Sequence, residues 1–451
     1  MQLANKRVLV VGLGRSGVAS ALFVKSQGAR VTVSDTKSED QLREEIPRLL
    51  DQGIAVETGG HGERTFRDQD LIVVSPGVPS DAEAITQARA LGQRVIGEIE
   101  LAFAFLRGSV VAITGSNGKT TTTTLVGEIL KAGGFETLVG GNIGTPAISL
   151  VSQSTPETVT VLEVSSFQLE TIVSFRPKIA VVLNVTPDHL DRHRTFRAYV
   201  DAKARVFQNQ QDDDFAVLNY DDPTCRELAR RTQAEVVWFS RQAEVAEGAF
   251  LRGDEIRFRR QGAEQQIMPI EAIPLKGSHN VENVLAAVSS GRLMDCEPEK
   301  IRRAVENFKA VEHRLEYVAT VRGVEYYNDS KATNVDATIK ALEAFPGNIH
   351  LILGGKDKGS DYTVLRDLLR RRVKRVYTIG AAAEKIQSET QEAVKVVPSG
   401  TIEVAIQQAA ESAEPGDVVL LAPACASFDQ FQNYEHRGRV FKQLVHGLTA
   451  G

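Results

Sequence analysis

The stretch Val110–Leu125 reads VVAITGSNGKTTTTTL and contains three local signals in succession. An apolar run ends at Thr114, a turn with Gly115 and Gly118 follows, and a run suited to a helix begins near Lys119. This order predicts a strand, a tight loop and a helix. Such a unit is typical of an α/β domain with a parallel sheet.

The loop in this stretch has the residue types that a polyphosphate site needs. Glycines let backbone N–H groups approach phosphate oxygens, and a helix N-terminus adds about half a unit of positive charge. Lys119 would reach the terminal phosphates, and the hydroxyl of Thr120 or Thr121 would ligate Mg²⁺. The spacing G-x-x-G-K-T is shorter than the usual P-loop pattern, and an ordinary turn containing these residue types is the alternative. We predict an ATP site formed by Gly115, Ser116, Asn117, Gly118, Lys119, Thr120 and Thr121.

Length and composition set the class of protein. A chain of 451 residues can form about three domains of roughly 150 residues, and 42% hydrophobic with 25% charged content is ordinary for a globular protein. The net charge of −5 and 6% aromatic content argue against a nucleic-acid surface. Three scattered cysteines exclude a disulfide framework or zinc cluster and suit a reducing compartment. Without a membrane-length apolar run or a signal peptide, we expect a cytoplasmic protein with no membrane insertion.

The N-terminal segment carries a second phosphate-loop signal. An apolar strand, Lys6–Val11, leads into G-x-G-x-x-G at residues 12–17, and the next strand, Arg30–Val33, is followed by Asp35. This is the fingerprint of a dinucleotide such as NAD or FAD on a doubly wound sheet. The pattern is weak when it stands alone, because the same loop accepts any diphosphate. It therefore indicates a diphosphate before it indicates redox chemistry.

A further buried strand near residues 70–74 ends in the turn Ser75-Pro76-Gly77-Val78-Pro79. The turn would lie at the carboxyl edge, where open α/β sheets bind ligands. An ordinary strand-ending turn explains the pattern equally well.

Two strand ends after the ATP loop suggest metal ligands. The strand Thr158–Val164 carries Glu163 near its end, and the strand Ile179–Val185 leads to His189. An acidic residue beside a phosphate loop is where a further Mg²⁺ ligand would lie. For Glu163 alone, a structural role is an equal alternative; His189 and the upstream ATP loop favour the metal interpretation.

Other polar features have ordinary interpretations. Residues 140–144 look like a tight backbone turn, and the helix expected at residues 199–205 reads as a solvated charged face, Lys203 included. Asn280 and Asn283 share a helix face, so they could contact a base edge, or Asn280 could cap the helix.

The last third of the chain has its own alternation of strands and helices. Strands are expected at Val324–Tyr327, Ile349–Leu353, Arg375–Ile379 and Val418–Leu421. Polar clusters follow three of them, at residues 328–334, 354–359 and 423–431. Because all three follow apolar strands, they should gather on one edge of a second sheet, which is the geometry of a ligand site.

The whole pattern predicts an α/β fold in three domains. We expect a Rossmann-like domain at residues 1–98, a central P-loop ATPase-like parallel sheet at residues 99–309, and a Rossmann-like C-terminal domain at residues 310–451. Residues 235–274 look like a peripheral hairpin region without evident chemistry.

Seven motifs that run along the whole chain resemble a known family. They are TGSNGKTTT, ExSSFQ, NVTPDHLDRH, GSHNVENVLAA, EHRLE, NDSKATN and PACASFDQF. In this order they resemble the Mur ligase family of bacterial peptidoglycan synthesis. GLGRSG, VSPGVP, NDSKATN and PACASFDQF are most similar to the branch that adds D-glutamate, whereas the L-alanine-adding branch has a histidine-containing motif in place of NDSKATN.

The resemblance implies a reaction. ATP would phosphorylate the free carboxylate of UDP-MurNAc-L-Ala, the amine of D-glutamate would attack the acyl phosphate, and phosphate would leave the tetrahedral intermediate. Splitting the reaction in this way makes sense, because a carboxylate is a poor electrophile and phosphate is a good leaving group. The implied partners are these two small molecules, with no nucleic acid, and the implied protein is a monomer.

The resemblance also implies roles for individual residues. A cofactor set of ATP, two Mg²⁺ ions and a CO₂-derived carbamate on Lys203 would use Thr120, Glu163, His189 and the modified Lys203 as metal ligands. The carbamate would turn a cation into an anion that can join the metal site. The residues implied at the catalytic centre are Lys119, Glu163, His189, Lys203 and His313.

Three further sets bind substrates in this scheme. ATP would also be contacted by Asn280, Asn283, Arg314, Asp329 and Lys331. The UDP-sugar would be bound by Gly14, Arg15, Ser16, Asp35, Thr36, Ser75, Gly77, Asn142 and Ser165. D-glutamate would be held by Thr333, Lys358, Ser427 and Tyr434.

Three other functions compete with this one. A folylpolyglutamate synthase-like amide ligase would share the ATP loop, but the N-terminal diphosphate loop argues against it. A nicotinamide oxidoreductase would explain the G-x-G-x-x-G pattern but not the ATP loop. A non-catalytic nucleotide-binding regulator would keep the fold without turnover.

Overall fold

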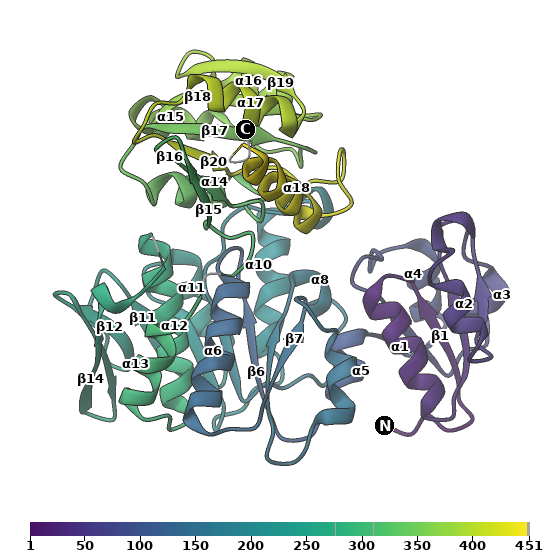
Figure 1. Ribbon diagram of the computed structural model, residues 1–451. Helices are drawn as coiled ribbons and strands as arrows, with labels where there is room; N and C mark the ends of the chain where they lie inside the picture. Colours follow the sequence, from purple (N-terminus) through teal and green to yellow (C-terminus); the bar gives the residue numbers. More distant parts are fainter. Residues whose placement is uncertain (276, 310, 449–451) are drawn as a thin grey trace. The chain divides into compact units, whose positions relative to one another are not determined.

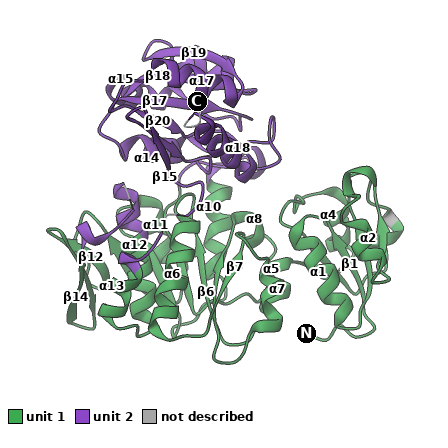
Figure 2. Cartoon of the chain, viewed as in Figure 1, with its two compact units in different colours: residues 1–185, 197–268, 284–304 green, residues 186–196, 269–283, 305–451 purple. Residues whose placement is uncertain are grey.

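The computed structural model describes residues 1–275, 277–309 and 311–448, and these form three β-sheets with surrounding helices (Figure 1). The chain divides into two compact units (Figure 2). Unit 1 contains residues 1–185, 197–268 and 284–304, and unit 2 contains residues 186–196, 269–283 and 305–451. The three sheets are mostly parallel, so the predicted α/β class is confirmed.

The first sheet has the strand order β3-β2-β1-β4-β5, and all its pairs are parallel. Its strands are β1 (Arg7–Val11), β2 (Arg30–Ser34), β3 (Ala55–Glu57), β4 (Leu71–Val74) and β5 (Val95–Gly97). Its helices are α1 (Arg15–Ser26), α2 (Ile46–Leu50), α3 (Glu63–Arg67) and α4 (Glu83–Ala90). Chain connections leave β1 toward β2 on one side and return to β4 on the other, so the predicted doubly wound arrangement is confirmed.

The sequence of β1 explains why both faces of this sheet are covered. Successive side chains of a strand point to opposite faces. Val8 and Val10 belong to the apolar core that includes α1, whereas Leu9 and Val11 belong to a second core that includes Ile85 of α4. Full burial of each such side chain contributes about 1.5–3 kcal/mol before conformational entropy is subtracted.

Helix α5 (Glu98–Phe103) joins the first sheet to the second through two buried carboxylates. The Glu98 carboxylate accepts the N–H of Ile148, in α7 (Ala147–Leu150), at 2.8 Å. The Glu100 carboxylate accepts the N–H groups of residues 173–175 at 2.8–2.9 Å. Burial raises the pKa of Glu98 to about 7.

The second sheet has the order β14-β13-β12-β11-β10-β9-β6-β8-β7. Its strands are β6 (Ser109–Thr114), β7 (Thr137–Gly141), β8 (Val159–Glu163), β9 (Ile179–Val182), β10 (Phe215–Asn219), β11 (Glu235–Ser240), β12 (Gly248–Arg252), β13 (Glu255–Arg260) and β14 (Ala263–Pro269). Its helices are α6 (Lys119–Gly133), α7, α8 (Ser166–Leu169), α10 (Phe196–Ala204), α11 (Pro223–Leu228) and α13 (Pro298–Glu306), with part of α12 (Ser278–Leu293).

The tight turn predicted at residues 140–144 is confirmed only in part. Gly140 and Gly141 end strand β7 and pair with β8, and the bend follows at residues 142–145. A Cβ on Gly140 would lie 2.4 Å from the carbonyl oxygen of Thr145, and one on Gly141 would lie 2.4 Å from that of Glu163. The glycines are therefore explained by close backbone approach rather than by a turn of their own.

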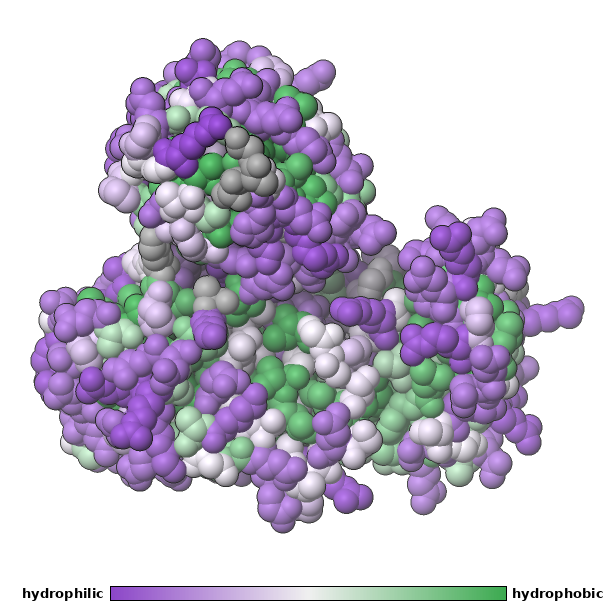
Figure 3. All heavy atoms as spheres, viewed as in Figure 1, coloured by the Kyte–Doolittle hydropathy of each residue, from purple (hydrophilic) through white to green (hydrophobic). Residues whose placement is uncertain are grey.

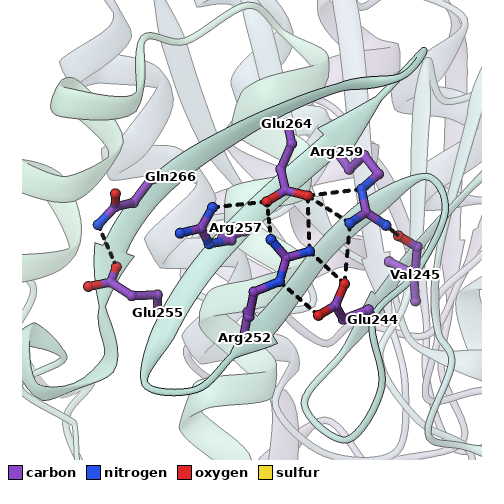
Figure 4. Close-up of polar contacts among 8 residues, drawn as sticks. All are labelled: Glu244, Val245, Arg252, Glu255, Arg257, Arg259, Glu264 and Gln266. Atoms are coloured by element: carbon purple, nitrogen blue, oxygen red, sulfur yellow. Dashed lines mark hydrogen bonds and ion pairs between the residues drawn. The ribbon is translucent and has the colours of Figure 1, made fainter.

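The predicted hairpin region at residues 235–274 is confirmed as strands β11–β14. Figure 4 shows an arginine–glutamate network on these strands. Glu264 contacts Arg252 at 2.7 Å, Arg257 at 2.9 Å and Arg259 at 2.7 Å. Hydrogen bonding to Arg252 lowers the pKa of Glu244 to about 2. Because these side chains are partly exposed at the surface, the network contributes little to stability.

The third sheet has the order β15-β16-β20-β17-β18-β19. Its strands are β15 (Glu316–Val321), β16 (Val324–Asn328), β17 (Ile349–Gly354), β18 (Val373–Ile379), β19 (Lys395–Gly400) and β20 (Val418–Leu421). Its helices are α14 (Val335–Glu343), α15 (Arg366–Arg372), α16 (Ala383–Thr390), α17 (Ile402–Ser412) and α18 (Tyr434–Gly447), and unit 2 also contains the short α9 (Leu190–His193). The four predicted strands are confirmed, whereas the half-exposed edge strands β15 and β19 were not predicted.

Hydrophilic side chains cover most of the face shown in Figure 3. Among the described residues, no helix combines the length and apolar character that a membrane span requires.

Candidate active site

The predicted phosphate loop connects β6 to α6, as the sequence indicated. Gly115 and Gly118 have φ values of +150° and +86°, and Gly118 immediately precedes the first residue of the helix. A Cβ on Gly115 would lie 3.0 Å from the Cβ of Leu183. Glycine is required at both positions, because few L side chains adopt these φ values.

Two lysine ammonium groups lie against this loop. Lys119 Nζ donates to the carbonyl oxygens of Gly115 and Ser116 at 2.9 and 2.8 Å, and Lys203 Nζ donates to that of Gly115 at 2.7 Å. Lys203 is 1% exposed, so its interpretation as part of a solvated face is wrong. Its Nζ lies 4.5 Å from the ring centroid of Tyr199, whose hydroxyl contacts Ser116 Oγ at 3.1 Å.

A carboxylate lies beside the first turn of α6. Glu163, at the end of β8, is 2% exposed. Its Oε2 accepts from Thr120 Oγ1 at 2.7 Å, and its Oε1 accepts from Asn142 Nδ2 at 2.9 Å. The structure thus brings together two predicted metal ligands and one predicted sugar-binding residue. Hydroxyl and carboxylate oxygens of this kind are the ligands that Mg²⁺ prefers.

The N-terminal glycine loop is tied to the two neighbouring strand ends. Asp35 accepts the N–H of Leu13 at 2.6 Å, and Ser75 Oγ donates to the carbonyl oxygen of Gly12 at 2.7 Å. A Cβ on Gly17 would lie 1.8 Å from that same oxygen, so the third glycine of the pattern is sterically required. Asp35 and Ser75 therefore shape the loop whether or not they also contact a ligand.

The loop residues gather where adjacent strands end. β2, β1 and β4 are neighbours in the sheet, so the segments that follow them share its carboxyl edge. The predicted sugar-binding residues in these segments are Gly14, Arg15, Ser16, Asp35, Thr36, Ser75 and Gly77.

Ser165 has a structural role that the sequence motif did not indicate. It caps α8: its Oγ accepts the N–H of Gln168 at 3.3 Å, and the Gln168 side chain accepts the N–H of Ser165 at 2.9 Å. This reciprocal capping box fixes the turn directly after Glu163.

His189 lies in unit 2, whereas Thr120, Glu163 and Lys203 lie in unit 1. His189 has a φ of +54°, and its N–H donates to Asp188 Oδ1 at 2.8 Å. Within unit 2 the Asp188 carboxylate also accepts from Asn334 Nδ2 at 2.9 Å and from Lys358 Nζ at 3.3 Å. Asp188 thereby links the motif around His189 to two of the C-terminal polar clusters.

The two candidate adenine-binding residues contact each other. Asn283 Nδ2 donates to Asn280 Oδ1 at 3.0 Å, and both side chains are buried in the first turns of α12. The predicted shared face of Asn280 and Asn283 is confirmed.

The three polar clusters of the third sheet lie together, as predicted. They follow β16, β17 and β20, which are parallel neighbours, so they meet at one edge. Backbone hydrogen bonds between Lys356 and Ala426, at 2.8 and 3.1 Å, join two of them. Thr333, Lys358 and Ser427 belong to these clusters.

A buried arginine that the sequence reasoning missed holds two of the clusters. Arg437, in α18, is fully buried, and its guanidinium donates to Ser330 Oγ at 3.0 Å, to the Ser330 carbonyl at 2.8 Å and to the Cys425 carbonyl at 3.1 Å. Burial lowers the pKa of Arg437 to about 10. An arginine in an amphipathic helix normally faces solvent, so no local signal revealed its partners.

The environment of His313 favours a neutral imidazole. Burial lowers its pKa, although Glu312 and Glu316 lie nearby and act in the opposite direction. Asn328 Nδ2 contacts His313 Nδ1 at 2.9 Å, so Nδ1 accepts and the ring proton lies on Nε2. The imidazole is 6.3 Å from the ring of Tyr434, centroid to centroid.

Asp329 and Lys331 lie next to this histidine. Burial raises the pKa of Asp329 to about 6, and Arg314 acts against that rise. Lys331 N–H donates to the carbonyl oxygen of His313 at 3.1 Å, and its Nζ is 5.1 Å from the ring centroid of Tyr434. Charged, aromatic and imidazole groups thus converge around a single strand end.

Family comparisons match all three parts of the chain. Residues 6–97 match the Mur ligase MurD-like N-terminal domain, residues 113–291 the Mur ligase middle domain, and residues 313–425 the Mur ligase glutamate ligase domain. A relative from Koribacter versatilis, named UDP-N-acetylmuramoylalanine--D-glutamate ligase, is 66% identical and covers 100% of this chain and 99% of its own length. The chain belongs to the Mur ligase family. A relative of the same name from Acidobacterium capsulatum is 58% identical over 99% of this chain and 97% of its own length.

Solved Mur ligase structures share the fold at much lower identity. A pseudomurein peptide ligase type C from Methanothermus fervidus aligns with a TM-score of 0.61 and 20% identity, over 98% of this chain and all of its own. At this identity the likeness supports the fold of this Mur ligase and says nothing further about its substrates.

Proposed function

We propose that this Mur ligase joins D-glutamate to UDP-MurNAc-L-Ala at the expense of ATP, a step of peptidoglycan precursor synthesis. The observation that carries the proposal is the 66% identity, over the whole chain, to a relative named for this reaction. The phosphate loop beside Glu163, in unit 1, and the three converging clusters, in unit 2, supply the kinds of groups that the reaction needs.

The proposed reaction has two steps. A carboxylate oxygen of UDP-MurNAc-L-Ala attacks the γ-phosphorus of ATP, which forms an acyl phosphate and releases ADP. The amine nitrogen of D-glutamate then attacks the carbonyl carbon, and the tetrahedral intermediate expels phosphate while the nitrogen loses a proton. Activation as an acyl phosphate is needed because the free carboxylate is a poor electrophile.

The phosphate loop and several residues outside it would bind the nucleotide. Lys119 already directs its ammonium at the loop carbonyls, so it can turn to phosphate oxygens without leaving the site. The first turn of α6 offers N–H groups and its dipole to the same phosphates. We assign Asn280 and Asn283 to the adenine and Arg314, Asp329 and Lys331 to the rest of the nucleotide.

The residues around Glu163 fit a magnesium site. Bound Mg²⁺ would neutralise phosphate charge and favour attack on the γ-phosphorus. Thr120 and Glu163 would hold one ion, and His189 with a carbamate on Lys203 would contribute to a second. Among the described residues, no group of three or more His, Cys, Asp or Glu side chains could hold a metal ion. Mg²⁺ commonly completes its coordination with phosphate oxygens and water.

The remaining residues would orient the two other substrates. The N-terminal loop residues, with Asn142 and Ser165, would bind the UDP-sugar, because a G-x-G-x-x-G loop at a strand edge suits its diphosphate. Thr333, Lys358, Ser427 and Tyr434 would hold D-glutamate, and the neutral His313 would lie beside the reacting groups. We further propose that the protein acts as a monomer in the cytoplasm.

An isotope experiment tests both the function and the intermediate. UDP-MurNAc-L-Ala labelled with ¹⁸O in its carboxylate is incubated with ATP, Mg²⁺ and D-glutamate, and the products are analysed by mass spectrometry. We expect the ligated product together with inorganic phosphate that carries one ¹⁸O atom. Ligation with unlabelled phosphate would exclude the acyl phosphate, and absence of ligation with D-glutamate would refute the proposed function.

A further inference from the structure

The phosphate loop is held from the side by the segment that follows β9. β6 and β9 are parallel neighbours, and their pairing continues past both strand ends. Leu183 N–H donates to the Thr114 carbonyl at 3.1 Å, and Ser116 N–H donates to the Asn184 carbonyl at 2.9 Å. The loop is therefore not a free turn, because one side of it is hydrogen bonded to residues 183–184.

The side chain of Asn184 extends this pairing by one further residue. Its Oδ1 accepts the N–H of Asn117 at 2.8 Å, and its Nδ2 donates to the carbonyl oxygen of Asn117 at 3.1 Å. A single carboxamide thus satisfies both main-chain groups of Asn117, as a neighbouring strand would. Asn184 is 8% exposed, so water could replace these two bonds only at a cost.

The segment that carries Asn184 is itself anchored. Asn219 Nδ2 donates to the Leu183 carbonyl at 2.9 Å, and Val185 N–H donates to Asp222 Oδ2 at 2.9 Å. Asn184 therefore contacts the loop from a segment that is itself hydrogen bonded on both sides of Asn184.

The residue that Asn184 holds lies immediately before the functional part of the loop. Asn117 precedes Gly118, with its positive φ, and Lys119, the first residue of α6. Fixing the Asn117 peptide sets the direction in which the chain enters the helix. We propose that Asn184 is a positioning residue for the nucleotide, because it keeps the loop in the shape that receives phosphates before they bind. A preformed loop avoids the entropy loss of ordering on binding.

The inference rests on the proposed role of the loop in ATP binding, and its test separates phosphate contacts from the rest of the nucleotide. Binding of ADP and of adenosine, which has no phosphate, is measured by calorimetry for the unsubstituted protein and for Asn184→Ala. We expect the ADP dissociation constant to rise about tenfold, as loss of two buried hydrogen bonds implies, with adenosine affinity unchanged.

Asn209→Ala is the matched control. Asn209 Nδ2 also donates to two main-chain carbonyls, those of Val173 and Phe175, each at 3.0 Å. This variant also loses two side-chain bonds to main-chain carbonyls in the same unit, at a less buried position and away from the loop, so we expect ADP binding to remain unchanged. If Asn184→Ala does not fold, Asn184→Ser, which cannot span both groups of Asn117, is measured in its place with the same expectation.

Each outcome decides between a positioning and a merely structural role. Equal ADP affinity in the unsubstituted protein and the Asn184 variant would overturn the inference and leave the proposed function intact. An equal loss of ADP and adenosine affinity would also overturn it, because general destabilisation of the protein would weaken the binding of both ligands alike. Failure of the unsubstituted protein to bind ADP would refute the nucleotide role of the loop itself.

Discussion

The carboxyl group of Glu98 makes the stability of unit 1 depend on pH. Glu98 begins α5, accepts the N–H of Ile148 at 2.8 Å and is 1% exposed. Burial raises its pKa from the ordinary value of 4.5 to about 7. The folded protein therefore holds a proton on Glu98 that the unfolded chain releases between these pH values.

The difference between the two pKa values of Glu98 determines the direction and the size of the change in stability with pH. A carboxyl with a raised pKa contributes its full stability below about pH 4.5 and loses that contribution as the pH rises through about 7. The difference between 4.5 and about 7 corresponds to at most about 3 kcal/mol. Glu98→Gln keeps the size and the carbonyl acceptor for Ile148 but cannot ionise. We therefore expect the variant to match the parent near pH 4.5 and to exceed its unfolding free energy by up to about 3 kcal/mol near pH 8.

Urea unfolding at several pH values measures the difference between the two proteins. Hydrogen-exchange protection of the Ile148 amide gives the local opening free energy, which is needed because unfolding of several domains is not a two-state process. Glu128→Gln, which removes an exposed partner of Lys131, is the control and should not change the pH dependence. A difference between Glu98→Gln and the parent that stays constant from about pH 4.5 to 8 would refute the reasoning.

Three further substitutions test the site. Glu163→Gln should lower turnover at least about a hundredfold, because an amide is a poor Mg²⁺ ligand; turnover close to that of the parent would exclude Glu163 from the metal site. Lys203→Arg keeps the positive charge but cannot form a carbamate. Steady-state assays should therefore show turnover falling by a similar factor, and ¹³C NMR in labelled bicarbonate should show no carbamate signal. An active Arg variant would mean that a cation at this position suffices. Arg437→Met leaves the carbonyls of Ser330 and Cys425 without their donor, so thermal unfolding should show that the unfolding free energy falls by about 2–4 kcal/mol. Steady-state kinetics should show a raised KM for D-glutamate with little change in the KM for ATP. Unchanged KM values would make the role of Arg437 purely structural.

The sequence predicted the parts of the fold that local patterns specify. The spacing of glycines and lysine predicted the loop of residues 115–118. The rule that ligand-binding segments gather at the carboxyl edge of a parallel sheet predicted that the three polar clusters would meet. β15 and β19 were missed because edge strands are half exposed and lack a continuous apolar run.

Other features depend on contacts far apart in the chain, which no local pattern encodes. Lys203 looked solvated because its helix is rich in charges, yet it is buried against Gly115, 88 residues away. Arg437 contacts Ser330 across 107 residues, and Asn184 contacts Asn117 across 67. Burial of such polar groups is decided by tertiary packing, so local sequence patterns do not specify it.

Phosphate release from ATP and Mg²⁺ in the presence of UDP-MurNAc-L-Ala tests the central claim most directly. D-glutamate, L-glutamate and no amino acid are compared, and the product mass is measured in each reaction. The account predicts release that needs both UDP-MurNAc-L-Ala and D-glutamate, together with a product heavier by one glutamate residue. Equal release with L-glutamate, or no release while ATP still binds, would contradict it.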